Sequence, residues 1–407
     1  MKKIGCFILV FITLISSLSV TASADDISSF DMDYSKFKGT TLNVYNWGEY
    51  ISDGSEDSYD VIAEFEALTG IRVNYETFDS NESMYSKLKS GAANYDVVIP
   101  SDYMIERLKD EGMLEELDFS NIPNIKYVDE KYRSLFFDPD NKYAVPYTAG
   151  YVGLIYNTEV VEGTPDSWSI MWDDAYLDKI LMMNNPRDAF GVAQYLLGQD
   201  VNNESDELWY AALQKLKEQK PIVKGYVMDE IFNKMESGDA AIAAYYAGDF
   251  LTMYAENDSL AFVYPKEGTN VFVDAMCIPK GAKHKEAAEL FINFMLEPEV
   301  AIANAEYICY ASPCSCVYTN EDYIAAMTEI HEDAMEILYG TDGVKAQYFE
   351  NLSPEMLAKM NNLWEELKVE ASASGGVYII SAVIVAGLVA AIVVNAYIKK
   401  KRAKYYD

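Results

Sequence analysis

The chain has 407 residues and a formal net charge of −33 at pH 7. A surface this acidic repels nucleic acid and anionic lipid headgroups, disfavours phosphate or sulfate as a bound solute, and attracts cations. The length is too great for one small core and predicts two domains. Because the chain is so acidic, no nucleic-acid partner is expected.

Residues 1–24 have the features of a secretory signal peptide. Lys2 and Lys3 supply a short positive region, an apolar stretch follows, and Ala22-Ser23-Ala24 is a small-x-small cleavage site. The Ser- and Asp-rich segment 25–40 is expected to be a flexible lead. The mature chain is therefore predicted to be exported.

The first part of the exported body alternates between strand and helix patterns. Short β-type runs cover 41–45, 71–78 and 95–100, and apolar residues at helical spacing cover 58–69, 81–90 and 103–111. Strands that alternate with helices predict parallel βαβ units and an α/β fold.

The pattern changes near residues 143–150. A β-rich stretch follows at 151–156, and a second alternating region continues to about residue 265. A strand is predicted at 271–279, and the later helices are expected over 285–296, 322–338 and 354–368. Residues 369–376 are expected to form a short linker rich in small residues.

The segment 377–398 holds 22 residues without a charge, which is long enough to cross a bilayer as a helix. Tyr378 and Tyr397 lie near its ends, where amphipathic rings prefer the headgroup layer, and a basic cluster follows at once. We therefore predict a transmembrane helix over 377–398 and a cytoplasmic basic tail over 399–407. The predicted localisation is the cell membrane, as a single-pass protein with an extracytoplasmic body.

Four cysteines remain after removal of the signal peptide, namely Cys277, Cys309, Cys314 and Cys316. Export permits disulfides, and four cysteines allow three full pairings among which the sequence does not choose. The cluster of Cys309, Cys314 and Cys316 could instead bind a soft metal, but it has no CxxC pair and no histidine nearby. No metal site and no cofactor are predicted.

The sequence offers little support for catalysis. Its two histidines, His284 and His331, lie in charged helical contexts typical of solvated surface residues. No nucleophile elbow, zinc-protease or P-loop pattern occurs. Residue type alone does not exclude a paired-carboxylate hydrolase, but nothing singles out a pair. We therefore expect a protein that is not an enzyme.

Several short segments combine aromatic rings with a carboxylate or a turn signal. They are Trp47-Gly48-Glu49-Tyr50, Pro100-Ser101-Asp102-Tyr103, Arg187-Asp188-Ala189-Phe190, Tyr245-Tyr246-Ala247-Gly248-Asp249 and Phe272-Val273-Asp274. Clefts in open α/β sheets lie at the carboxyl ends of strands. The recurrence of such segments after predicted strands therefore indicates a ligand cleft.

The order and spacing of these and other segments resemble the bacterial spermidine/putrescine-binding proteins, the extracytoplasmic receptors of polyamine ABC transporters. The similarity covers about residues 41–368 and is carried by the segments 42–50, 65–71, 80–85, 95–101, 145–147, 264–268 and 292–296. The resemblance implies a two-lobed, periplasmic-binding-protein-like α/β fold of type II with an interlobe cleft. One lobe would comprise 41–146 and 271–315, and the other 147–270 and 316–368.

The resemblance also implies which residues contact the ligand. The family positions fall on Trp47, Tyr50, Ser101, Tyr103, Asn185, Asp188, Tyr246, Phe272, Asp274 and Glu350. Asn185 stands where the family has an acid, whereas Tyr246 and Phe272 stand where it has tryptophan. These departures bear on which polyamine is preferred.

A polyamine is a row of ammonium groups joined by methylenes. Each buried ammonium needs an acceptor, which Asp188, Asp274 and Glu350 would supply through charge-assisted hydrogen bonds. Aromatic rings would contact the methylenes and attract the ammonium groups through their faces. We therefore predict a membrane-anchored, monomeric, extracellular solute-binding protein that captures spermidine or putrescine and delivers it to an ABC permease.

Two alternatives stay open. The adjacent Tyr245 and Tyr246 are similar to the phenolate ligands of ferric-iron receptors, and rings in a cleft also suit sugars, so the solute could be another one. The chain could also be a membrane-anchored sensor ectodomain without a transport role.

Overall fold

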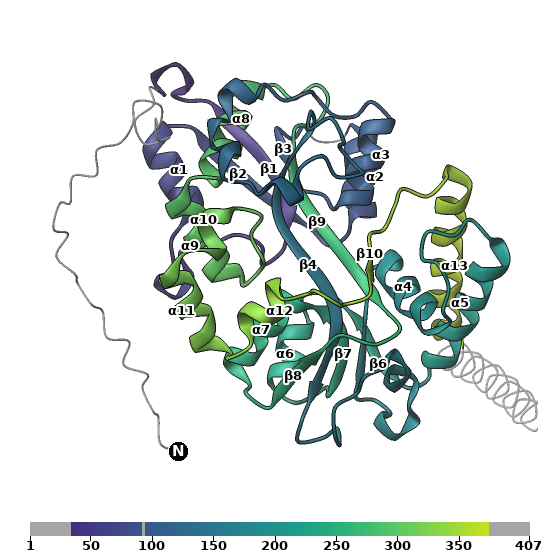
Figure 1. Ribbon diagram of the computed structural model, residues 1–407. Helices are drawn as coiled ribbons and strands as arrows, with labels where there is room; N and C mark the ends of the chain where they lie inside the picture. Colours follow the sequence, from purple (N-terminus) through teal and green to yellow (C-terminus); the bar gives the residue numbers. More distant parts are fainter. Residues whose placement is uncertain (1–33, 92–93, 374–407) are drawn as a thin grey trace, which may run out of the picture.

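A computed structural model describes residues 34–91 and 94–373 (Figure 1). Its strands are β1 (Thr41–Trp47), β2 (Arg72–Phe78), β3 (Val97–Val98), β4 (Ala144–Asn157), β5 (Ile180–Met183), β6 (Val223–Val227), β7 (Ile242–Tyr246), β8 (Leu260–Val263), β9 (Thr269–Cys277) and β10 (Ala346–Gln347). Its α-helices are α1 (Val61–Thr69), α2 (Asn81–Ser90), α3 (Asp102–Asp110), α4 (Pro186–Leu196), α5 (Asp206–Gln219), α6 (Ile231–Glu236), α7 (Ala247–Glu256), α8 (Lys285–Met295), α9 (Pro298–Ile308), α10 (Ser315–Tyr318), α11 (Glu321–Ile330), α12 (Ala334–Tyr339) and α13 (Pro354–Ala373).

Two long strands connect two α/β lobes. The first half of β4 pairs antiparallel with β9, and its second half pairs with β7 and β8. On one side β1 pairs in parallel with β2 and β3, and on the other β5 pairs in parallel with β6 and β7. Figure 1 shows β4 and β9 running side by side from one lobe to the other. The structure therefore has the two-lobed α/β architecture that the sequence predicts.

The strand order explains why the cleft lies between the lobes. The described strands join in the order β2-β1-β3-β9-β4-β7-β5-β6, so that β9 and β4 occupy the middle of the path. These two strands therefore connect the two lobes of the sheet path. The exact lobe boundaries expected from the sequence stay a prediction.

Local signals in the sequence account for the helices of the first lobe. Asp60 caps α1 by accepting a 2.8 Å hydrogen bond from the Ala63 amide, and Gly70 ends the helix in a left-handed conformation with a φ of 71°. Phe65 of α1 packs edge-on against Phe291 of α8, with ring centroids 5.1 Å apart. This contact holds two helices distant in sequence on the same side of the sheet.

The second lobe places a helix directly behind the cleft. Asn185 caps α4 by accepting a 3.1 Å hydrogen bond from the Arg187 amide, and Pro186 takes the first helical position. The buried Phe190 of this helix packs against Trp209 of α5 and Trp364 of α13, at 5.1 and 6.2 Å between ring centroids. The packing fixes the first turn of α4 at the end of β5.

Two of the predicted boundaries differ from the structure. The lead expected to be flexible over 25–40 is described from Tyr34 onward, and there a 3₁₀ turn over Ser35–Phe37 buries Tyr34 and Phe37. Helix α13 was expected to end at Lys368 but continues to Ala373, into the predicted linker. The lead is ordered from Tyr34 because the side chains of Tyr34 and Phe37 are buried. Helix α13 continues to Ala373 because alanine has a high helix propensity.

The fold class needs one correction, because the predicted transmembrane helix is not supported. Across residues 34–91 and 94–373, no helix is both long and apolar enough to cross a bilayer. The longest of them, α13, has 20 residues and carries Lys359, Glu365 and Lys368 along its length. The segments predicted as a signal peptide (1–24), a membrane helix (377–398) and a basic tail (399–407) lie outside the described residues.

Candidate functional site

A cavity lies between the lobes at the ends of several strands. Trp47 is the last residue of β1, Ser101 follows β3, Asn185 follows β5, and Tyr246 is the last residue of β7. Phe272 and Asp274 reach the cavity from the connecting strand β9. The cavity and its mouth together contain about 710 Å³ free of protein atoms, a volume that includes solvent open to the outside.

The structure brings together all but one of the candidate residues. Those lining the cavity are Trp47, Tyr50, Ser101, Tyr103, Asn185, Asp188, Tyr246, Phe272 and Asp274. Glu350 does not line it: its side chain is exposed, and the preceding residue, Phe349, contributes the wall instead. Residues 348–351 lie in a loop without a recognisable motif. An alignment of this segment with the family is therefore easily shifted by one residue.

Asp188 is held in the first turn of α4 with its carboxylate in the cavity. The Tyr246 hydroxyl donates a 3.0 Å hydrogen bond to Asp188 Oδ2, and the Asn270 amide lies 3.5 Å from Oδ1. Burial raises the pKa of Asp188 to about 7, against the opposing effects of the Tyr246 hydrogen bond and the Arg187 charge. The carboxylate of Asp188 therefore titrates near neutral pH.

Asp274 projects from β9 and is similarly buried. The Tyr50 hydroxyl donates a 2.7 Å hydrogen bond to Asp274 Oδ2 and also contacts the Thr148 hydroxyl. The other oxygen, Oδ1, is buried and has no hydrogen-bond partner in the protein. Burial raises the pKa of Asp274 to about 6, although the polar neighbours Ser101 and Tyr50 lower it. An unpartnered carboxylate oxygen is thus left for a ligand.

A second group of carboxylates was not among the candidates. Asp249 in the first turn of α7 accepts a 2.9 Å hydrogen bond from the Tyr310 hydroxyl, and burial raises its pKa to about 8. Asp229 follows β6; its partial burial and the charges of Glu49 and Asp79 raise its pKa. Asp249 lies in a segment that was expected to form the cleft, although it was not among the ligand contacts inferred from the family resemblance, whereas no such segment contains Asp229.

The charge of the cavity wall is entirely of one sign. Its acidic residues are Glu49, Asp79, Asp102, Asp188, Asp229, Asp249 and Asp274, and among the described lining residues there is no lysine, arginine or histidine. Such a concentration of carboxylates with no protein cation in contact favours a ligand that carries positive charge.

One buried cation lies just behind this wall. Arg187 donates hydrogen bonds to the Val201 carbonyl at 2.9 Å and to Asn202 Oδ1 at 2.8 Å. Its guanidinium carbon lies 4.2 Å from the centroid of the Phe349 ring. Arg187 therefore holds the loop that carries Phe349 and lowers the pKa of Asp188 without lining the cavity.

Aromatic rings form the rest of the wall. Phe272 meets the edge of Tyr246 at 5.4 Å between centroids, and Tyr50 meets Tyr310 at 4.8 Å. The Phe272 ring lies directly over Gly150, where any Cβ would overlap it. These rings supply apolar faces for methylene groups and negative faces for cations.

The two lobes approach each other closely at the cavity mouth. A Cβ built on Gly48, in the first lobe, would overlap the carboxylate of Asp229 in the second. The backbone amide of Asn351 also donates a 2.9 Å hydrogen bond to Glu106 Oε2, which joins the loop before α13 to α3. The cleft is thus narrow in this structure.

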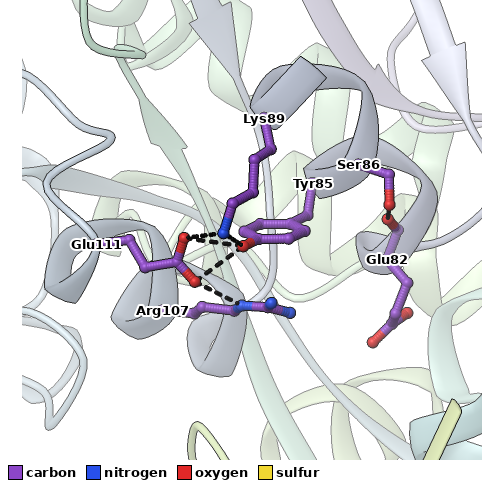
Figure 2. A network of polar contacts seen from close by, with 6 residues as sticks. All are labelled: Glu82, Tyr85, Ser86, Lys89, Arg107 and Glu111. Atoms are coloured by element: carbon purple, nitrogen blue, oxygen red, sulfur yellow. Dashed lines mark hydrogen bonds and ion pairs between the residues drawn. The ribbon is translucent and has the colours of Figure 1, made fainter. Parts of the chain in front are cut away.

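A polar network away from the cavity holds α2 against α3 (Figure 2). Glu111 accepts hydrogen bonds from Tyr85, Lys89 and Arg107, which lower its pKa to about 2 although burial opposes the shift. The Arg107 guanidinium stacks 3.6 Å from the Tyr85 ring centroid. The same two helices also meet at the cavity, where the Asn81 side-chain amide at the start of α2 donates a 3.1 Å hydrogen bond to the Tyr103 hydroxyl of α3.

Comparisons with known proteins agree with this geometry. The family model described as bacterial extracellular solute-binding protein matches residues 93–325. The spermidine/putrescine-binding periplasmic protein of Salmonella typhimurium is 35% identical over 277 residues, covering 67% of this chain and 77% of that protein. The protein of the same name from Escherichia coli is 34% identical over the same shares.

Solved structures show the same fold. A chain from Listeria monocytogenes superposes with a TM-score of 0.74 at 38% identity, covering 81% of this chain and 99% of the other. The spermidine/putrescine ABC transporter substrate-binding protein PotD of Streptococcus pneumoniae gives a TM-score of 0.65 at 33% identity, with the same coverage. The predicted two-lobed, periplasmic-binding-protein-like fold is confirmed.

The relatives also bear on localisation and activity. They are named as periplasmic binding proteins, and no described helix could span a bilayer. The predicted single-pass localisation in the cell membrane is therefore wrong on these findings and is not retained. The relatives are binding proteins rather than enzymes, as the sequence analysis expected for this chain. This chain belongs to the family of bacterial extracellular solute-binding proteins that includes the spermidine/putrescine-binding periplasmic proteins.

Proposed function

We propose that this protein captures a polyamine, spermidine or putrescine, in the interlobe cavity and delivers it to the permease of an ABC transporter. The observation that carries the proposal is the cavity wall, in which carboxylates alternate with aromatic rings and no described lining residue is basic. The names of its relatives support the same ligand class.

The carboxylates fall into two groups by their electrostatic neighbours. Asp188 interacts with Asp274, whereas Asp249 interacts with Asp229 and Glu49. Two groups suit a ligand that carries ammonium charges at both ends of an apolar chain, because each buried ammonium needs its own acceptors. The rings of Tyr246, Phe272 and Tyr50 contact the methylenes between them.

The ligand would also hold the two lobes together. Asp188 and Asp249 belong to helices of the second lobe. Trp47 ends β1 and Ser101 follows β3 in the first lobe, and Asp274 lies on the connecting strand β9. A cation bound among them interacts with both lobes at once and stabilises the closed arrangement. Such closure gives a permease a shape by which to distinguish loaded from empty protein.

Competition binding tests the proposal. Spermidine and putrescine should each bind saturably, and a neutral diol of the same chain length should not compete. Binding of the diol with equal affinity, or of ferric iron or a sugar in place of the amines, would contradict a site built for ammonium groups.

A further inference from the structure

Tyr103 of the cavity wall belongs to a chain of hydrogen bonds that leads out of the cavity. The Ser101 backbone amide donates a 3.2 Å hydrogen bond to Asn81 Oδ1, and the Asn81 side-chain amide donates a 3.1 Å hydrogen bond to the Tyr103 hydroxyl oxygen. The Tyr103 hydroxyl in turn donates a 3.1 Å hydrogen bond to Glu82 Oε1. Ser101, Asn81 and Tyr103 line the cavity, whereas Glu82 does not.

The first donor of this chain fixes the direction of every later hydrogen bond. A backbone amide can only donate, so the oxygen of Asn81 must face Ser101 and its NH₂ group must face Tyr103. The Tyr103 oxygen therefore accepts from Asn81, and its proton is directed to the Glu82 carboxylate, which only accepts. The Tyr103 hydroxyl has no proton left to donate into the cavity, but its oxygen can still accept a hydrogen bond.

Glu82 is an unfavourable residue for the stability of this part of the fold. It lies in the first turn of α2, and Figure 2 shows its carboxylate apart from the group around Glu111. Its second oxygen, Oε2, is buried and has no hydrogen-bond partner among the described residues. A buried carboxylate that is hydrogen-bonded through one oxygen only reduces the free energy of unfolding. Packing of α2 therefore does not account for a charged residue at this position.

The surroundings of Glu82 support its charged form against the effect of burial. Burial raises the pKa of Glu82, but its own backbone amide at the start of the helix and the Tyr103 hydrogen bond oppose the rise. The positive charges of Arg187 and Arg107 oppose it as well. Arg187 belongs to the second lobe, and its guanidinium carbon lies 6.0 Å from the centroid of the Tyr103 ring. Tyr103 thus contacts a carboxylate of its own lobe and lies near a cation of the other.

We propose that Glu82 is a positioning residue of the binding site: by holding the Tyr103 proton, it presents the Tyr103 oxygen as a hydrogen-bond acceptor to an ammonium group of the ligand. This inference rests on the proposed function. An ammonium group has donors and no acceptor, so a hydroxyl that donates into the cavity opposes its binding and a hydroxyl that accepts favours it. A carboxylate on the hydroxyl proton also polarises the oxygen and strengthens it as an acceptor.

Nuclear magnetic resonance of the ligand-free protein tests the hydrogen bond itself. In protein isotopically labelled at the ζ carbon of tyrosine, the Tyr103 signal is identified by its absence in Tyr103→Phe. Donation to a carboxylate moves this signal toward the position of a tyrosinate, so Glu82→Gln should move it back toward that of a neutral tyrosine. The exposed Glu64→Gln on α1 is the matched control and should leave the signal in place. An unchanged Tyr103 signal in Glu82→Gln would overturn the proposal.

Calorimetric titration with spermidine tests the effect on the ligand. Glu82→Gln leaves only a neutral acceptor for the Tyr103 hydroxyl, so affinity should fall by about threefold to tenfold. The melting temperature of the ligand-free variant should not fall, because the substitution removes a buried charge that is hydrogen-bonded through one oxygen only. A melting temperature that falls together with the affinity would give Glu82 a merely structural role and contradict the proposal.

The variant Tyr103→Phe separates an effect through the hydroxyl from a direct effect of the Glu82 charge. In this background Glu82→Gln should change spermidine affinity by less than about twofold, because no hydroxyl remains to be positioned. An equal loss of affinity in both backgrounds would contradict action through Tyr103. If the wild type bound no polyamine, the proposed function would fail, and the Tyr103 signal would still decide whether Glu82 holds the proton.

Discussion

The Tyr50 hydroxyl donates a 2.7 Å hydrogen bond to one oxygen of Asp274 and leaves the other oxygen buried without a partner. Tyr50 follows β1 in the first lobe, whereas Asp274 lies on the strand that connects the lobes. Tyr50 thereby orients the Asp274 carboxylate toward the cavity and hydrogen-bonds only one of its two oxygens. The remaining oxygen is a buried hydrogen-bond acceptor directed at the cavity and is the most direct sign of a ligand site in the structure.

Replacing this carboxylate should weaken binding strongly. Asp274→Asn keeps the shape of the side chain and its hydrogen bond from Tyr50, but it leaves a bound ammonium without its charge partner. Affinity for spermidine should fall by more than about tenfold. The exposed Asp140→Asn is the matched control and should bind as the wild type does. Equal affinity in the Asp274 variant, measured by calorimetry, would place the site elsewhere.

The second carboxylate group should recognise the far end of the ligand. Asp249→Asn keeps an acceptor for Tyr310 while removing the charge. It should weaken putrescine several-fold or more but change the affinity for n-butylamine, which has one ammonium, much less. The measurement is the ratio of the two dissociation constants in each protein. An unchanged ratio would mean that Asp249 does not contact the ligand.

Asn185 offers a test that gains affinity. The residue lines the cavity and caps α4 through its oxygen, and aspartate caps a helix equally well. Asn185→Asp should therefore fold normally and raise spermidine affinity several-fold by adding a carboxylate near the ammonium groups. Reduced affinity in a variant with an unchanged melting temperature would show that the amide itself contacts the ligand.

Binding should strengthen as the pH rises. Burial raises the pKa values of Asp274, Asp188 and Asp249 to about 6, 7 and 8, so protons compete with the cation. Polyamine affinity should increase between about pH 5 and pH 8 with release of protons, detected by calorimetry in buffers of different ionisation enthalpy. Affinity that is independent of pH would contradict these raised pKa values.

The same groups set an opposite trend for the ligand-free protein. Because their folded pKa values lie above about 3.9, the value in unfolded chains, their contribution to stability is full below about pH 4. It is lost as the pH rises through the folded values. The melting temperature of ligand-free Asp249→Asn should consequently fall less than that of the wild type between about pH 5 and pH 9. Parallel curves would contradict the raised pKa of Asp249.

The sequence predicted much of the fold because its local signals agree with the packing. Caps such as Asp60 and Gly70 define α1, and alternating strand and helix patterns define both lobes. The pattern could not show that β4 continues past Pro146 from one lobe to the other, with a shift of register against β9 between Pro146 and Thr148. A proline inside an apolar run suggests a break, but pairing with β9 on both sides of Pro146 continues the strand, and its second half then pairs with β7.

The candidate site was predictable where residues lie in motifs next to strands, as Asp188 and Asp274 do. Asp229 was missed because it approaches Gly48 only when the two lobes are brought together, a long-range relationship that no local pattern contains. The prediction that Glu350 lines the cavity was wrong because no local pattern fixes the position of its side chain. Its loop carries no periodic signal, and the structure turns Phe349 rather than Glu350 toward the cavity.

The measurement that tests the central claim most directly is calorimetric titration of the purified protein with spermidine and with putrescine. The carboxylate-lined cavity predicts saturable, one-site binding of at least one of them at micromolar or tighter affinity, with a matching rise in melting temperature. The absence of both heat and thermal shift with either polyamine would contradict the proposed function.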